Sequence, residues 1–204
     1  MRQTRALFSP ILRSFSKPPY FQPAFSFSAI VCLIVVMATF QVAHASGNGH
    51  FKEAKNLQTL AQMSQQSGQP ILLMFGAQWC EHCQELDEQV FEPIAMGGNY
   101  DGKVVLMRHI GVDEQALIPG FDGKLIKKSE WAYQLNADLT PSVLFFDGFG
   151  NEVAPRIIGI SNTHLYAGLI HSHLNIAYKN MNNPYRIPIT PDLYELQLKN
   201  TPTN

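Results

Sequence analysis

The sequence predicts an α/β domain in which helices flank both faces of a mixed central sheet. Two apolar runs, 71–75 and the centre of 103–112, each follow a segment with the 3.6-residue apolar spacing of a helix. That order is typical of crossover connections between parallel strands. The last two predicted strands, 142–146 and 152–160, are separated by a short turn with two glycines, which indicates an antiparallel hairpin. Crossovers combined with a hairpin predict a mixed sheet.

The first half of the domain alternates helix, strand, helix and strand. Apolar residues at near-helical spacing run over 51–67, and a Ser-Gly-Gln-Pro sequence ends that helix. Residues 71–75 are continuously apolar, which is typical of a strand buried on both faces. After a turn, Cys80 opens a second helix that we expect to end at Pro93, because proline disrupts a helix interior. Residues 103–112 form the next strand.

The second half contains an insertion before its first helix. Residues 113–128 hold the turn signals Pro-Gly and Asp-Gly and no clear periodicity, so we interpret them as an inserted loop. A helix over 129–135 follows, with a serine at its start. The hairpin strands come next, and a final helix over 162–178 closes the domain. Residues 179–204 contain several prolines, and we expect them to form a loosely held extension with one short helix after Thr190.

The first 45 residues differ in character from the rest. They hold four basic residues, no acidic residue, and an apolar stretch over 29–40 that precedes Ala43-His44-Ala45. This combination predicts a cleaved secretory signal peptide. The alternative is an uncleaved N-terminal anchor, for which the apolar stretch is shorter than the roughly 20 residues of a spanning helix. Both readings predict that the domain, 46–178, and its extension, 179–204, are exported to the periplasm.

Composition limits the classes of partner. Without residues 1–45 the chain loses four of its 15 basic residues and none of its 16 acidic ones, so the remainder is acidic. An acidic surface without basic clusters argues against nucleic acid as a partner. We expect a monomer that contacts the membrane only if the N-terminal segment stays uncleaved. Of three cysteines, two remain, and both belong to one C-x-x-C motif.

The motif Cys80-Glu81-His82-Cys83 predicts a redox-active dithiol. Two cysteines three positions apart in the first turn of a helix lie close enough for a disulfide. Unpaired N–H groups and the positive end of the helix dipole stabilise a thiolate there. Cys80 is then the nucleophile and Cys83 the resolving thiol. A cationic His82 would favour the reduced form further.

Two other interpretations of the motif remain open. A structural disulfide that closes only four residues constrains the unfolded chain little. A metal site would use the C-x-x-C as half of a tetrahedral set, and the chain has no second such motif to complete it. We therefore assign no metal and no cofactor. His171 and His173 point to different faces of their helix, so we expect both to be solvated. Lys124, Lys127 and Lys128 are expected to be solvated as well.

The residues around the motif resemble the active-site segment of thioredoxins, in which a strand ends in F-x-A-x-W-C-x-x-C. Residues 75–83 fit this pattern, and residues 139–147 look like the segment that carries the family's cis-proline. The resemblance covers about residues 51–178 and is nearest to exported thioredoxin-like proteins of the SoxW and disulfide-isomerase-related kind. It implies a cis Thr140–Pro141 bond beside the dithiol, whereas the sequence alone favours an ordinary trans bond. It also implies that Trp79, Thr140 and Pro141 contact the substrate.

One position departs from the thioredoxin pattern. Thioredoxins place a buried carboxylate six residues before the first cysteine, where it helps to deprotonate the resolving thiol; here that residue is Met74. Glu81, His82 or Glu85 are the candidates to replace it, and Met74 is expected to pack in the core. Glu81-His82 also replaces the thioredoxin Gly-Pro. Histidine at this place resembles the strongly oxidising members of the family.

Two functional hypotheses follow. The first is an exported thiol–disulfide oxidoreductase that acts on protein disulfides, with Glu81 and His82 tuning the dithiol and a redox partner protein resetting it. The second is a non-catalytic thioredoxin-fold binding module, or a copper or zinc carrier that uses the C-x-x-C. Trapped mixed disulfides through Cys80 would distinguish the first hypothesis from the second.

Overall fold

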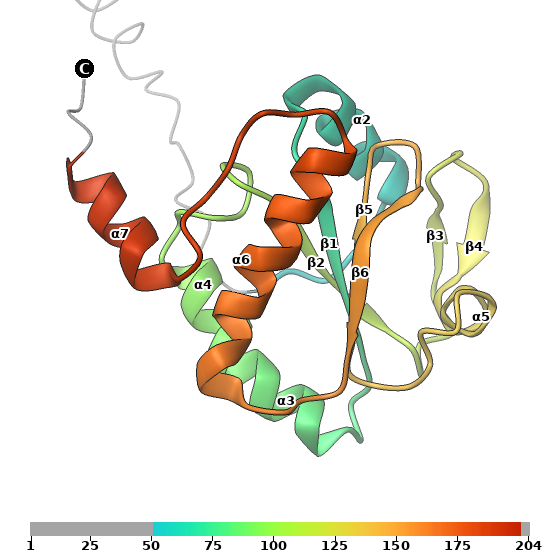
Figure 1. The fold of residues 1–204 in the computed structure, drawn as a ribbon. Helices are drawn as coiled ribbons and strands as arrows, with labels where there is room; N and C mark the ends of the chain where they lie inside the picture. The colour runs from blue at the N-terminus through green and yellow to red at the C-terminus, as the bar shows by residue number, and fades with distance from the viewer. Residues whose placement is uncertain (1–50, 201–204) are drawn as a thin grey trace, which may run out of the picture. The chain divides into compact units, whose positions relative to one another are not determined.

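A computed structural model describes residues 51–200 of the chain. Four strands form the central sheet in the order β2-β1-β5-β6, with helices on both of its faces (Figure 1). The predicted signal peptide or anchor over 1–45 lies outside the described residues. None of the helices within residues 51–200 combines the length and apolar character needed to cross a membrane.

The sheet is mixed, as the sequence predicts. β1 (Ile71–Gly76) runs parallel to β2 (Leu106–Gly111) and antiparallel to β5 (Ser142–Phe146). β6 (Glu152–Ile158) continues the sheet by antiparallel pairing with β5. Every residue of β1 is buried, because helices cover both faces of this central strand. The register pairs Met74 with His109 on β2 and with Val143 on β5.

Each face of the sheet has its own core. On one face, α2 (Leu57–Ser67) and α5 (Lys128–Gln134) cover side chains that include Leu73 and Phe75. On the other face, α6 (Thr163–Asn180) and the segment that carries the dithiol cover Leu72 and Met74. Alternation along β1 separates these two sets, because successive side chains of a strand point to opposite faces. The expectation that Met74 packs in the core is confirmed.

The first helix begins later than predicted. Asn56 caps α2 by accepting a hydrogen bond from the N–H of Thr59, 2.9 Å away. Residues before it are extended, and Glu53 forms a parallel bridge with His109 at the edge of β2. Phe51 stacks on Phe91, with 4.6 Å between ring centroids. The apolar residues before Asn56 are therefore buried by long-range contacts rather than by helix formation.

The helix after the dithiol does not end at Pro93. It comprises α3 (Glu81–Leu86), a π-helical turn η1 (Asp87–Phe91) and α4 (Glu92–Met96). Pro93 falls at the start of α4, where a missing N–H costs little. A π-turn inserts one extra residue into a helix and is frequent at functional sites.

The insertion is a small folded unit rather than a plain loop. β3 (Leu117–Pro119) and β4 (Leu125–Lys127) pair in an antiparallel hairpin beside α5 (Figure 1). Ile118 of this hairpin is buried against the core on the α2 and α5 side. The remaining predicted elements are confirmed, with ends that differ by up to three residues.

The C-terminal extension is packed, contrary to the expectation of a loosely held tail. Its helix α7 (Pro191–Asn200) buries Tyr194, and the connection from α6 buries Ile187. His171 of α6 is also fully buried, so the prediction of a solvated histidine is wrong. Its ring contacts the Tyr100 hydroxyl through Nε2 and the Pro188 carbonyl through Nδ1, at 2.8 and 2.6 Å. The extension covers His171, so the spacing of the two histidines along α6 could not reveal that this one is buried.

Candidate active site

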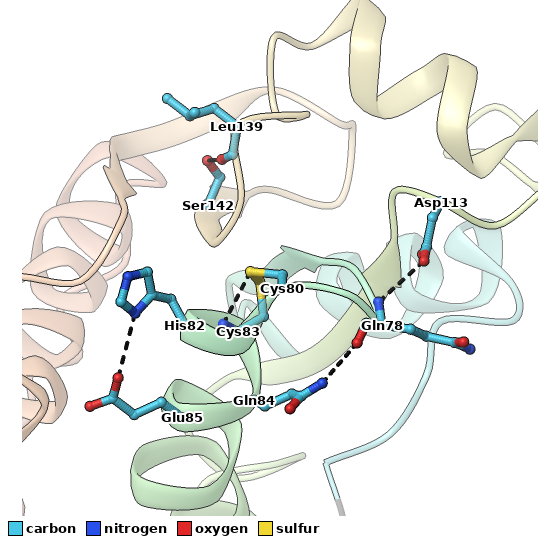
Figure 2. The surroundings of a disulfide bond; sticks show 9 residues. All are labelled: Gln78, Cys80, His82, Cys83, Gln84, Glu85, Asp113, Leu139 and Ser142. Atoms are coloured by element: carbon cyan, nitrogen blue, oxygen red, sulfur yellow. Dashed lines mark hydrogen bonds and ion pairs between the residues drawn. A yellow bond between two sulfur atoms is a disulfide. The ribbon is translucent and has the colours of Figure 1, made fainter.

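Cys80 and Cys83 form a disulfide at the start of α3. The sulfurs are 2.13 Å apart and the Cα atoms 5.2 Å apart (Figure 2). Cys80 is the N-cap residue of α3, and the N–H of Cys83 donates to its sulfur at 3.1 Å. A sulfur at an N-cap receives one of the helix N–H groups that lack an intrahelical partner. Both cysteines are largely buried, at 6% and 4% exposed.

Hydrogen bonds hold the turn that leads from β1 into the dithiol. The N–H of Cys80 donates to the carbonyl of Ala77 at 3.1 Å. The N–H of Gln78 donates to the carboxylate of Asp113, and Gln84 donates to the carbonyl of Gln78 (Figure 2). Trp79 is left exposed at 69% on this turn. The turn is thus held by the segment that follows β2 and by α3, while its tryptophan faces solvent.

The Thr140–Pro141 peptide bond is cis, as the resemblance to thioredoxins implied. Phe75 pairs with Ser142, so Pro141 lies at the same end of the sheet as the dithiol turn. The carbonyl of Pro141 accepts a hydrogen bond from Gly159, and Ser142 Oγ donates to the carbonyl of Leu139 at 2.5 Å. Figure 2 shows the Leu139–Ser142 loop across from the disulfide. The structure therefore brings Trp79 and the predicted proline segment to one end of the sheet.

Glu81 and His82 lie on the outer side of α3. Glu81 is exposed. The His82 side chain is 76% exposed, and its Nδ1 lies 3.6 Å from Glu85 Oε2 (Figure 2). All three residues suggested as substitutes for the carboxylate absent at position 74 are thus on the solvent side of the helix. None of them lies beneath Cys83.

The sequence did not single out three partly buried ionisable side chains, Glu53, Asp87 and His109. Asp87 follows Cys83 by one helical turn, and its N–H donates to the carbonyl of Cys83. Its Oδ1 is buried without a hydrogen-bond partner among the described residues. Burial raises the pKa of Asp87, Glu92 raises it further, and His109 opposes the rise. The spacing of four residues from Cys83, one helical turn, is the signal in the sequence by which Asp87 could have been found.

Lys128 connects the insertion to this set. Its ammonium lies 2.5 Å from Glu53 Oε1 and 2.6 Å from Glu114 Oε2, and its side chain is 3% exposed. Burial acts to lower the pKa of Lys128, but the two carboxylates outweigh it and raise the pKa. The prediction that Lys128 is solvated is therefore wrong. Burial also acts to raise the pKa of Glu53, and the hydrogen bonds from His109 and Lys128 hold that pKa below its usual value.

A cavity lies beside the helical segment that carries the dithiol and is lined in part by Glu88 and Val90 of η1. It has a volume of about 740 Å³ and lies between α4, α6 and α7. Within residues 51–200, no three histidine, cysteine, aspartate or glutamate side chains converge so as to hold a metal ion.

A family model described as a thioredoxin-like domain matches residues 57–173. The chain belongs to this family. The matched residues of the thioredoxin-like domain contain the dithiol, the insertion and the cis-proline.

Curated relatives of this thioredoxin-like domain include thiol:disulfide interchange proteins DsbD. The protein from Cronobacter sakazakii is 28% identical over 113 residues, which are 55% of this chain and 18% of that protein. The protein from Ralstonia nicotianae is 24% identical over 114 residues, 54% of this chain and 16% of that protein. The chain therefore matches less than a fifth of the length of these relatives.

Solved structures similar to the thioredoxin-like domain include oxidised thioredoxin O2 from Arabidopsis thaliana. That structure is 20% identical with a TM-score of 0.39, over 61% of this chain and 96% of the other. A thioredoxin-fold protein from Helicobacter pylori is 14% identical with a TM-score of 0.43, over 76% and 86% of the two chains.

Proposed function

We propose that this chain is an exported thiol–disulfide oxidoreductase that exchanges disulfides with protein substrates through Cys80 and Cys83. The position of Cys80 at the N-cap of α3 carries the proposal. There its sulfur accepts the N–H of Cys83 at 3.1 Å. The same N–H and the positive end of the helix stabilise a Cys80 thiolate once the disulfide is reduced.

The exchange proceeds through a mixed disulfide. When the reduced domain meets a disulfide, the Cys80 thiolate attacks one sulfur, and the other sulfur leaves with the electron pair of the broken bond. The thiol of Cys83 then loses its proton and attacks Cys80, which re-forms the 80–83 disulfide and releases the substrate as a thiolate. The reverse sequence oxidises a substrate dithiol. Cys83 takes the resolving role because Cys80, at the N-cap of α3, is the better stabilised thiolate and therefore the attacking one.

Substrate binding is assigned to the exposed edge around the dithiol. Trp79 and Leu139 are 69% and 65% exposed, and both belong to loops at the dithiol end of the sheet. Large exposed apolar side chains at one site mark surfaces that bind a partner. Between them, Thr140 and Pro141 supply backbone with which an extended substrate segment can pair. No resident cofactor is required, because the dithiol itself carries the electrons.

His82 and Glu81 are assigned to tuning of the dithiol. His82 is adjacent to Cys83, and when it is cationic it favours the thiolate form of the pair. The relatives named thiol:disulfide interchange proteins support a role in transfer of electrons between proteins. The redox partner of this chain is accordingly a second dithiol protein, and its N-terminal segment directs the domain to the periplasm.

Trapping tests the proposal. The Cys83→Ser variant retains the attacking thiol and lacks the resolving one, so it should accumulate mixed disulfides with periplasmic proteins that a reductant releases. The Cys80→Ser variant is the matched control and should accumulate none through Cys83. Absence of adducts in Cys83→Ser, together with stoichiometric tight binding of copper or zinc, would overturn the proposal in favour of a metal carrier.

Export is tested separately on the full chain. A fusion of a reporter that is active only outside the cytoplasm to the C-terminus should be active. Removal of residues 1–45 should abolish that activity. Mass measurement of the mature N-terminus then distinguishes a cleaved signal peptide, which begins after Ala45, from an uncleaved anchor. Equal reporter activity with and without residues 1–45 would contradict export.

A further inference from the structure

Carboxylates lie around the dithiol on more than one segment of the chain. Glu81 follows Cys80 directly and is exposed, and Glu85 lies one helical turn further along α3 with its side chain 43% exposed. Asp113, in the segment after β2, is also exposed and accepts the N–H of Gln78 on the dithiol turn (Figure 2). The turn that precedes the disulfide and the helix that follows it therefore both have carboxylates beside them.

The loop that carries the cis-proline adds a fourth carboxylate. Asp138 is exposed and directly precedes Leu139, whose side chain is 65% exposed in the loop across from the disulfide (Figure 2). On the dithiol turn, Trp79 is exposed at 69%. Each of the two segments that face one another at the disulfide thus presents a large apolar side chain together with a carboxylate.

Basic residues are missing from the same segments. The sequence has no lysine or arginine over 56–102, which contains the dithiol turn and α3, or over 129–155, which contains the cis-proline loop. Arg156 donates to the carbonyl of Leu135 near the start of that loop, but its guanidinium is paired with Glu152 at 2.6 Å. The charge around the dithiol is therefore predominantly negative.

The four carboxylates also lack the cations that neutralise others in this protein. Within residues 51–200, none of the four forms an ion pair with a lysine or arginine, and only Glu85 lies near a basic side chain, 3.6 Å from His82. By contrast, Glu53 and Glu114 share the buried ammonium of Lys128. Unpaired surface charge attracts partners of the opposite sign, raises their association rate and repels partners of the same sign.

We propose that Glu81, Glu85 and Asp138 select protein substrates and redox partners whose reactive cysteine is flanked by lysine or arginine. The inference rests on the proposed function and deepens it, because it names the chemistry of the segment that reaches Cys80. Exposed apolar side chains on both sides of the disulfide bind such a segment whatever its charge. The carboxylates around them decide which charge is favoured.

Two peptides that differ only in charge test the proposal. Each carries one cysteine in a disulfide with thionitrobenzoate, flanked by three lysines in one peptide and by three glutamates in the other. The Cys80 thiolate attacks the peptide sulfur, and coloured thionitrobenzoate, the better leaving group, departs with the electron pair of the broken bond. Cys83 then loses its proton to the buffer and attacks Cys80, which re-forms the 80–83 disulfide and releases the peptide as a thiolate. The full chain carries Cys32→Ser, so that Cys80 and Cys83 are its only thiols.

The measured quantity is the rate with the lysine peptide divided by the rate with the glutamate peptide. The same ratio for 2-mercaptoethanol gives the intrinsic reactivity of the two peptides and serves as the reference. At an ionic strength of about 0.01 M, where the Debye length is about 30 Å, we expect the ratio for the protein to exceed the reference about tenfold. At about 1 M, where the Debye length is about 3 Å, the two ratios should agree within about twofold.

Charge variants assign the effect to the residues named. Glu81→Gln combined with Glu85→Gln should lower the ratio at low ionic strength about threefold, and Asp138→Asn should lower it further. Because both rates come from the same variant, their ratio cancels any change in the intrinsic reactivity of the attacking thiol. The matched control combines Asp192→Asn with Glu195→Gln, which removes the same charge from exposed positions of α7 and should leave the ratio as in the wild type.

The outcomes separate this proposal from the proposed function. A ratio at low ionic strength equal to the 2-mercaptoethanol reference would overturn the selection of basic segments, and so would an equal loss of the ratio in the α3 and α7 double variants. The wild-type measurement needs no charge variant, so the proposal stays testable if one of them does not fold. Failure of the reduced protein to release thionitrobenzoate from either peptide would instead overturn the proposed function.

Discussion

The hydroxyl of Tyr100 and Nε2 of His171 lie 2.8 Å apart in the buried contact between α6 and the C-terminal extension. On the other side of the ring, Nδ1 lies 2.6 Å from the carbonyl of Pro188. Burial lowers the pKa of His171, and the hydrogen bond with Pro188 only partly opposes that effect. A neutral histidine thus joins α6 to the segment that follows it, and protonation at this place disfavours the folded state.

The first prediction concerns stability at mildly acid pH. Because the pKa of His171 is lower in the folded chain than in the unfolded chain, its contribution is complete above the unfolded value of about 6.5 and is lost as pH falls toward the folded value. One such group contributes a slope of at most about 1.4 kcal/mol per pH unit. We expect His171→Gln to be less stable than the wild type at pH 7.5 and to lose less stability on acidification.

Urea unfolding of both proteins at several pH values between about 5 and 7.5 measures this difference. His164→Gln is the control, since His164 lies on the exposed side of the same helix. Its stability should follow the wild-type curve. Parallel curves for His171→Gln and the wild type would contradict the assignment of His171 as the titrating group.

A second prediction concerns the buried ammonium of Lys128. Lys128→Met leaves the carboxylates of Glu53 and Glu114 without their shared cation. Loss of one partner of a buried ion pair costs about 3–5 kcal/mol, and because both carboxylates are about one-third exposed we expect about 2 kcal/mol. Chemical unfolding measures the loss.

Lys127→Met is the matched control for this substitution. Lys127 pairs with Glu130, whose side chain is 66% exposed, so its removal should cost less than about 1 kcal/mol. Adding Glu114→Gln to Lys128→Met should recover part of the lost stability, because one uncompensated carboxylate is removed. An equal effect of Lys127→Met and Lys128→Met would argue against the buried network.

The third prediction tests whether the C-terminal extension is part of the folded domain. Tyr194 is 3% exposed, donates to the carbonyl of Asn99 at 3.1 Å and packs edge-on against Tyr100 at 5.3 Å between centroids. Truncation of a buried aromatic side chain costs about 3–5 kcal/mol, so Tyr194→Ala should lower the free energy of unfolding by about 3 kcal/mol. Leu196→Ala, at a 54% exposed site of the same helix, should change it little. Equal melting temperatures for the two variants would show that α7 contributes nothing to folding.

A fourth prediction concerns the direction of electron flow. A cationic side chain next to the dithiol stabilises the reduced form, which makes the pair a better oxidant. We expect a reduction potential above thioredoxin's value of about −270 mV, and a decrease of about 30 mV in His82→Gln. Equilibration with glutathione buffers measures both.

Glu85→Gln, which removes the carboxylate 3.6 Å from His82, should shift the potential in the opposite direction. A wild-type value at or below −270 mV would contradict the role of His82.

Most of the element order was readable from local patterns. The continuous apolar run of β1 and the two ends of α6 depend on residues close in sequence, and both elements lie where the sequence predicts them within two positions. The start of α2 was misplaced because Phe51 fits helical spacing equally well. Its stacking on Phe91 comes from a residue far along the chain. The helix was expected to end at Pro93, because the spacing of its residues gives no sign of the π-helical turn that precedes this proline.

At the candidate active site, too, features set by nearby residues were predicted and features set by distant residues were not. Cys80 and Cys83 were identified from their own spacing, and the cis bond before Pro141 from resemblance to a family. Asp87 was within reach of the same reasoning, since it follows Cys83 by one helical turn. His109 was not. It comes from β2, and only the parallel pairing of Met74 with His109 brings it beneath the dithiol turn.

By itself, the sequence determined the dithiol, the mixed sheet and the alternation of helices and strands, because these depend on short-range periodicity and on one compact motif. The tertiary structure decided the environment of the dithiol. The burial of Lys128, the anchoring of His109 by Glu53 and the unpaired carboxyl of Asp87 all join segments that are distant along the chain. Charge and burial at such a site are sums over neighbours in space, and those neighbours are known only when the chain has folded.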